Sequence, residues 1–161
     1  MSSQPFDEIP AKLRSGVGHP EMAGFGRELR DAHTESELEA VVERAIGAKG
    51  WMEFRFFDLG DVLRKELGAK AAKSVRLLIG NPLVMKQMVK LVPDAGSYAP
   101  VTVLVDERAD GVHLSDDQMA SFLAPYGNVE TLWVANDLDS KIQSLRGGGK
   151  MNFRSGLCAG L

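Results

Sequence analysis

Apolar residues recur at every third or fourth position after Thr34, a spacing that predicts a helix with one face toward a core. The residues of this stripe are Leu38, Val41, Val42, Ala45 and Ile46. Thr34 and Glu37 have the spacing of a capping box, in which each side chain binds the backbone N–H of the other residue. Gly50 suits the left-handed position at the end of a helix. We therefore predict a helix from Thr34 toward Gly50.

The pattern changes to alternation of apolar and polar residues at Trp51, which predicts strands. The predicted strands are 51–57, 75–79 and 101–105. Asp110-Gly111 is a hairpin turn signal, and it returns the chain through a short strand at Val112–Leu114. We expect the alternating apolar positions to face one shared core made of Met52, Phe54, Phe56, Leu77, Ile79, Val103 and Val105.

Start signals place four further helices around these strands. Three of the helices begin at residues favoured as N-caps, namely Asp58, Asn81 and Asn128. Pro82 supports the second of these starts, because the first helical residue needs no backbone N–H partner. Ser115 and Gln118 have the spacing of another capping box, which predicts a short helix carrying Met119. The last helix has an apolar stripe made of Leu138, Ile142 and Leu145.

The two ends of the chain lack a sustained period. Residues 1–24 are rich in Ser, Gly and Pro, and we predict an extended N-terminal arm there, followed by a short strand near Gly26–Ala32. Residues 147–161 begin with three glycines and are predicted to form a Gly-rich C-terminal tail. The 161 residues are therefore expected to form one domain over residues 25–146, since domains commonly contain about 100–150 residues.

Composition excludes several classes of protein. An apolar fraction of 44% is sufficient for one core, and a net charge of −3 argues against a general nucleic-acid binder. Cys158 is the single cysteine, which excludes an intramolecular disulfide and a multi-cysteine metal site. No stretch approaches the roughly 18–20 apolar residues of a membrane span. We expect a soluble cytoplasmic protein without nucleic-acid or membrane partners.

The order of several short motifs resembles a known family, the bacterial domain of unknown function 302 (DUF302). The motifs are Leu77–Pro82, Pro100–Glu107, Asp110–Ser115 and Tyr126-Gly127, and the resemblance covers about residues 25–145. It implies a two-layer α+β fold, an antiparallel or mixed β-sheet packed against helices, and a homodimer. The sequence departs from the family at Asp116, where the family often has an aromatic residue. In a dimer, the stripe of the last helix is a candidate contact; the alternative is that it closes its own core.

Candidate functional residues are few. Asn81 lies at the turn from a strand to a helix, where backbone N–H groups and the helix dipole are available to a ligand. His113, on the neighbouring predicted hairpin, is the titratable residue that we expect to contribute to a pocket at this turn. Met85 and Met88 lie one helical turn apart within an apolar stripe, which favours core packing over soft-metal or haem ligation. No spaced set of catalytic residues or metal ligands is recognised, and no cofactor is assigned.

Three functional hypotheses follow. The favoured one is a non-enzymatic, self-associating module that binds a small molecule or a protein partner near the C-terminal end of the Val75–Ile79 strand, with Asn81 and His113 as contributors. The second is an enzyme in which His113 acts with Asp106 or Asp116 and the site assembles only in three dimensions. The third is a haem or metal carrier that uses His113 or a methionine.

Overall fold

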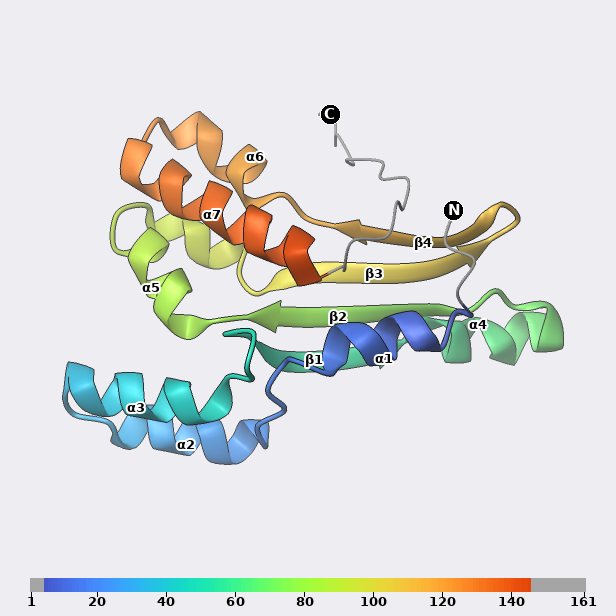
Figure 1. Cartoon of the computed structure of the whole chain (residues 1–161), viewed down its shortest axis with the longest axis horizontal. Coiled ribbons are helices and arrows are strands. Elements are labelled where there is room, and N and C mark those ends of the chain that lie inside the picture. The colour runs from blue at the N-terminus through green and yellow to red at the C-terminus, as the bar shows by residue number, and fades with distance from the viewer. Residues whose placement is uncertain (1–4, 146–161) are drawn as a thin grey trace.

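A four-stranded antiparallel sheet forms the centre of the computed structural model, which describes residues 5–145 (Figure 1). The strands are β1 (Met52–Asp58), β2 (Ser74–Gly80), β3 (Val101–Arg108) and β4 (Gly111–Asp116). Each strand pairs with the next one along the chain, so the spatial order is β1-β2-β3-β4. The predicted α+β class and the predicted hairpin at Asp110-Gly111 are confirmed.

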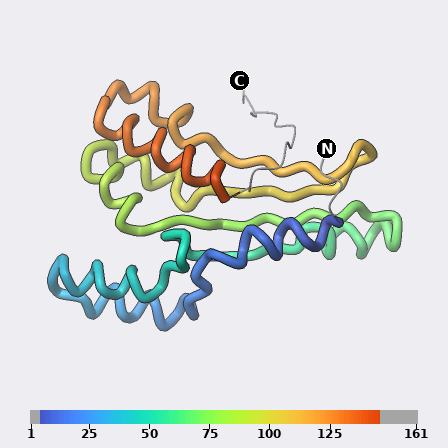
Figure 2. The backbone as a smooth tube through the Cα atoms, viewed as in Figure 1, coloured from blue at the N-terminus to red at the C-terminus, as the bar shows by residue number. Residues whose placement is uncertain are grey.

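Seven α-helices surround the sheet in the described residues, and the backbone trace shows their order (Figure 2). They are α1 (Glu8–Arg14), α2 (Met22–Asp31), α3 (Glu35–Ala45), α4 (Leu59–Leu67), α5 (Pro82–Val89), α6 (Met119–Leu123) and α7 (Val129–Leu145). Short 3-10 turns follow α4, α5 and α6 at Gly68–Lys70, Pro93–Ser97 and Ala124–Tyr126. Helices α1 and α7 contribute buried residues to the same core as β2, β3 and β4.

Alternating residues of β2 and β3 fill this main core, as the sequence predicts. Leu77, Ile79, Val103 and Val105 are all buried, and they pack with apolar residues of α1 and α7. The intervening Arg76 is exposed on the other side of the sheet. The alternation arises because successive side chains of a strand point to opposite faces of the sheet.

The prediction of one shared core is wrong for the first strand. Met52 is fully buried, but it packs in a second, smaller cluster with Phe25, Val41 and Val42 of α2 and α3. A β-bulge between Glu53 and Arg55 explains the difference. One extra residue in β1 turns the residues before the bulge to the opposite side from those after it. Phe56 therefore packs against the main core and Phe54 against the second cluster, both partly buried.

The predicted extended arm over residues 1–24 is also wrong. Helix α1 lies within it, and Phe6, Ile9 and Leu13 are buried in the main core. These residues have helical spacing, and Pro10 is tolerated because it lies in the first turn. The predicted strand at 26–32 is helix α2, whose Phe25 and Leu29 are one turn apart. The Gly-rich tail at 147–161 lies outside the described residues.

Most predicted helix starts are confirmed. Thr34 and Glu37 form the capping box of α3, Asp58 accepts from the Asp61 N–H, and Asn128 accepts from the Thr131 N–H. Helix α3 ends earlier than predicted, at Ala45, and Gly50 has its positive φ of 77° in the loop beyond it.

The predicted capping box of α6 is wrong, because Ser115 lies in β4 and pairs with Leu104 of β3. Asp139 of α7 replaces it and accepts from the N–H groups of Met119 and Ala120 at 2.8 and 3.0 Å. Burial raises the pKa of the Asp139 carboxyl, and these two backbone donors partly oppose that effect. Two segments that lie far apart in the sequence therefore join at this carboxylate.

The apolar stripe of the last helix closes the chain's own core. Leu138, Ile142 and Leu145 are each at most 4% exposed and pack with β2, β3 and β4. The prediction that this stripe offers a contact for a second copy is therefore wrong. The alternative, that it completes its own domain, is the arrangement observed.

Candidate ligand pocket

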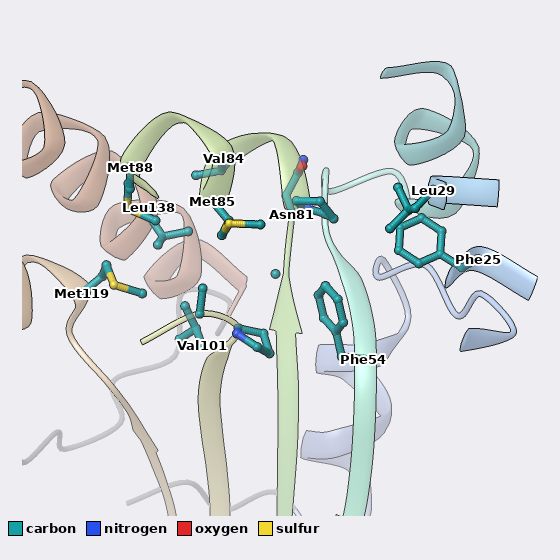
Figure 3. Close-up of a pocket in the computed structure, with 14 residues that line it drawn as sticks. Phe25, Leu29, Phe54, Asn81, Val84, Met85, Met88, Val101, Met119 and Leu138 are labelled. Carbon is teal, nitrogen blue, oxygen red and sulfur yellow. The ribbon is translucent and has the colours of Figure 1, made fainter. Parts of the chain in front are cut away.

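An apolar cavity of about 220 Å³ lies where β2 ends and α5 begins (Figure 3). Helix α2 contributes one wall, while α5, α6 and α7 contribute the other. Gly80 and the Ala99–Pro100 segment line the cavity. The other lining residues include Phe25, Leu29, Phe54, Asn81, Val84, Met85, Met88, Val101, Met119 and Leu138. The cavity thus lies between the main core and the second cluster.

Local sequence explains why space remains at this point. A side chain at Gly80 would place its Cβ 3.3 Å from the Phe54 ring and 3.4 Å from Pro100 Cβ, so glycine keeps the strand end open. The chain then leaves the sheet at Asn81, and Pro82 starts α5. A cis peptide bond joins Ala99 to Pro100 on the facing loop. The end of β2 is therefore free of bulky side chains on the pocket side.

Asn81 is the polar side chain of the pocket wall. Its Oδ1 accepts from the Leu83 N–H at 2.9 Å, and its Nδ2 donates to the Gly50 carbonyl at 3.0 Å. An amide side chain has two donor hydrogens and two acceptor lone pairs, so one of each remains after these bonds. Asn81 therefore caps α5 and connects it to the loop after α3, and its amide keeps one donor hydrogen and one lone pair after these two bonds.

The wall contains no ionisable side chain in the part of the chain that the structure describes. An ion moved from water into such surroundings would lose hydration without gaining a partner, which costs several kcal/mol or more. The pocket is therefore suited to an uncharged molecule.

His113 lies far from this pocket. It pairs across the sheet with Asp106, which pairs with Ser74 at the start of β2, whereas Asn81 follows the opposite end of that strand. Seven residues at roughly 3.3 Å each separate the two positions by about 23 Å. The predicted cooperation of Asn81 and His113 in one site is therefore wrong.

The side chain of His113 contacts a residue of its own hairpin turn. Its Nε2 lies 2.8 Å from Asp110 Oδ1, and this contact lowers the pKa of the Asp110 carboxyl. The Asp106 carboxylate instead binds the Arg108 guanidinium. Within residues 5–145, no group of three or more His, Cys, Asp or Glu side chains has the geometry of a metal site. Nor does any helix of that range combine the length and apolarity needed to cross a membrane.

A family model, "Domain of unknown function DUF302", matches residues 30–145, which is more than half of the chain. The chain belongs to the DUF302 family. The crystal structure of an uncharacterized conserved DUF302 protein from Bacillus stearothermophilus has the same fold, with a TM-score of 0.60. Its sequence is 11% identical, and the alignment covers 89% of each chain. A search of curated proteins found no match.

Part of the pocket lies before the residues that match the DUF302 model. The match begins at residue 30, whereas Phe25 and Leu29 of α2 form one wall of the cavity. Neither residue was predicted to line a site, although their spacing of four is a helical signal. Two glycines, Gly24 and Gly26, interrupt the apolar pattern and obscure that signal. In this DUF302 chain, the part of α2 that precedes the matched region therefore completes the cavity.

Proposed function

We propose that this DUF302 chain binds a small uncharged molecule in the apolar pocket beside Asn81. The observation that supports this most directly is a cavity of about 220 Å³ whose wall has one polar side chain and no ionisable one. An apolar cavity of about 150 Å³ holds benzene, which has six carbons, so scaling by volume gives a ligand of about nine nonhydrogen atoms. This is the size of a substituted single ring or a small fused bicycle.

The lining residues narrow the chemistry of the ligand. Phe25 and Phe54 offer aromatic faces and edges, and Met85 and Met88 are flexible thioethers that adapt to different shapes. The remaining hydrogen-bonding capacity of Asn81 supplies a single polar anchor. A neutral aromatic or branched aliphatic molecule with one polar group satisfies these features. Because the described residues of the wall include no nucleophile, acid or base, we propose binding without catalysis.

Indole is a suitable probe, because it has nine nonhydrogen atoms, no charge and one N–H donor. We expect a Kd between about 10 µM and 1 mM, measured by NMR shifts of the pocket residues. Leu29→Trp fills the cavity and is expected to weaken binding at least about tenfold. His113→Ala, about 23 Å away, is the matched control and should leave the Kd unchanged.

Two further comparisons test the same site. Indole-3-acetate carries a charge and is expected to bind at least about tenfold more weakly than indole, because its carboxylate finds no partner. Asn81→Ala should weaken indole binding and also cost about 1 kcal/mol of stability, since Asn81 caps α5. Equal affinity of wild type and Leu29→Trp for indole would contradict this location of the site.

We propose second that the chain forms a homodimer through the apolar face of α4. Five large apolar side chains of α4 and the adjoining end of β1 are at least 36% exposed: Phe57, Leu59, Val62, Leu63 and Leu67. Gly60 is the buried residue of this nine-residue helix, and helices that short are marginal in water without packing. Arg64 pairs with Asp58 and Asp61 of its own chain, which lets two identical surfaces meet without an excess of like charge.

Val62→Asp tests the dimer, because Val62 is 70% exposed and its side chain would be buried between two copies. Sedimentation of the wild type at tens of micromolar is expected to give a dimer, and the variant should shift to monomer with at least about a tenfold weaker association. Val129→Asp is the matched control, since Val129 is 80% exposed on α7, away from this face. A wild-type monomer at several hundred micromolar would contradict the proposal.

A further inference from the structure

We propose that the hairpin formed by α2 and α3, residues 22–45, is a hinged lid over the pocket and that an ion pair between Glu35 and Lys86 holds it closed. The proposal rests on the pocket proposed above and describes how access to it is controlled. It follows from where the hairpin is connected, what it covers and how it is fastened to the rest of the molecule.

The hairpin packs on β1 through the second, smaller cluster. Phe25 from α2 and Val41 and Val42 from α3 pack together with Met52, separately from the main core of the sheet. Figures 1 and 2 show the two helices side by side beyond β1, on the opposite side of the molecule from α6. Glu28 of α2 also pairs with Arg44 of α3, so the hairpin keeps contacts between its own two helices when it moves away from Met52.

Two glycine-containing segments connect the hairpin to the body, Gly16–Gly18 before it and Gly47–Gly50 after it. They cross in close contact: a Cβ on Gly18 would lie 1.9 Å from the Ala45 carbonyl oxygen, and one on Gly47 would lie 2.5 Å from the Gly16 carbonyl oxygen. The N–H groups of Gly18 and Gly47 both donate to the Trp51 carbonyl at 2.8 Å. The connection is therefore narrow and gathered at one point, which is the geometry of a hinge.

The pocket lies at the seam between hairpin and body. Phe25 and Leu29 of α2 approach it from one side, and Met85, Met88 and Leu138 approach it from the other (Figure 3). A rotation of the hairpin about the hinge would move the first wall away from the second. It would expose buried side chains on the body side, of which Met88 is 1% exposed in the closed position.

One ion pair joins the start of α3 to α5 across this seam. Glu35 Oε1 lies 2.6 Å from Lys86 Nζ, and their mutual hydrogen bond lowers the pKa of the carboxyl and raises the pKa of the ammonium group. Lys90 and Glu39 add weaker attraction toward the same two groups. Because the side chains are 74% and 37% exposed, salt screens this pair, so ionic strength should regulate the lid.

Thiol labelling of a buried cysteine tests the lid without any ligand. In a Cys158→Ser background, Met88→Cys places a thiol on the body side of the pocket, and Val103→Cys places one in the main core, where only global unfolding exposes it. When the two variants have the same free energy of unfolding, we expect Met88→Cys to react with a thiol reagent at least about tenfold faster than Val103→Cys. Lid opening should cost less free energy than global unfolding. Equal rates would overturn the lid.

Glu35→Gln tests the ion pair in the same assay. It should accelerate labelling of Met88→Cys about two- to fivefold, the effect of one exposed ion pair. Labelling of Val103→Cys should accelerate by no more than the same factor and stay the slower of the two, because the pair is lost in the open and the unfolded states alike. Raising NaCl from about 20 to 500 mM should accelerate labelling of Met88→Cys to a similar extent when Glu35 is present and should add nothing further in Glu35→Gln. Glu28→Gln is the matched control, since Glu28 pairs with Arg44 within the hairpin and does not reach the body. No acceleration in Glu35→Gln would remove the ion pair from the proposal.

Indole separates failure of the lid from failure of the pocket. If both proposals hold, saturating indole should slow labelling of Met88→Cys at least about fivefold, because a ligand that touches both walls favours the closed state. Labelling of Val103→Cys should slow by a similar factor, because the same ligand stabilises the closed state against global unfolding. Indole that binds by NMR while Met88→Cys labels only as fast as Val103→Cys would overturn the lid alone. Fast, salt-dependent labelling that indole does not change would overturn the pocket and retain the lid.

Discussion

Replacing Ile142 by alanine is expected to lower the free energy of unfolding by about 2–5 kcal/mol. Ile142 is 2% exposed and lies in the middle of the α7 stripe, between Leu138 and Leu145, against the strands of the main core. Removing its buried methyl and methylene groups loses their transfer free energy and leaves a cavity that close-packed neighbours fill only in part. Chemical denaturation followed by circular dichroism measures the loss.

This experiment also separates two roles for the α7 stripe. Because Ile142 packs within its own chain, the loss should be independent of protein concentration, and the association state should not change. Val129→Ala is the control on the same helix; Val129 is 80% exposed, so its effect should stay within about 0.5 kcal/mol. A loss of less than about 1 kcal/mol for Ile142→Ala would show that α7 does not close the core as described.

Replacing Gly18 by alanine is expected to cost about 3 kcal/mol or more, at the upper end of the range for overpacking. The added Cβ would lie 1.9 Å from the Ala45 carbonyl oxygen, and a backbone atom cannot rotate away as a side chain can. The two crossing segments would have to separate, which would lengthen the hydrogen bonds that Gly18 and Gly47 donate to Trp51. Chemical denaturation measures the cost.

Gly26→Ala provides the comparison for this prediction. Gly26 lies inside α2, and its nearest neighbour would be the Arg30 side chain at 3.7 Å, which is ordinary contact. Alanine is favoured over glycine inside a helix, so this variant should be more stable than wild type by about 0.5–1 kcal/mol. Similar destabilisation by both variants would mean that the crossing of the two segments does not determine the cost at Gly18.

Features encoded within a few residues could be predicted from the sequence. The capping box of Thr34 and Glu37, and the N-caps at Asp58 and Asn81, each depend on a side chain and a backbone N–H two or three residues away. The alternation along Val75–Ile79 likewise depends on strand geometry alone. The end of β2 could be predicted for the same reason, because Gly80-Asn81-Pro82 turns the chain from the strand into α5. We expected a pocket at this end because the start of the helix can orient a ligand there.

Features that join distant segments could not be predicted in this way. The bulge in β1 is set by its pairing with β2, yet it sends Met52 and Phe56 to different cores. The cap of α6 comes from Asp139, about twenty residues later in the chain, and replaces the local candidate Ser115. Strand pairing and helix docking select these arrangements because they give hydrogen-bond partners to buried backbone N–H and C=O groups that have no partner nearby in the sequence.

The two candidate site residues show the same division most clearly. The sequence by itself determined that Asn81 caps a helix at the end of a strand, because that role needs only its immediate neighbours. Only the tertiary structure decided that α2 supplies the facing wall of the pocket and that His113 lies at the other end of the sheet. The register of an antiparallel sheet fixes such distances, and register is a property of paired strands rather than of any one of them.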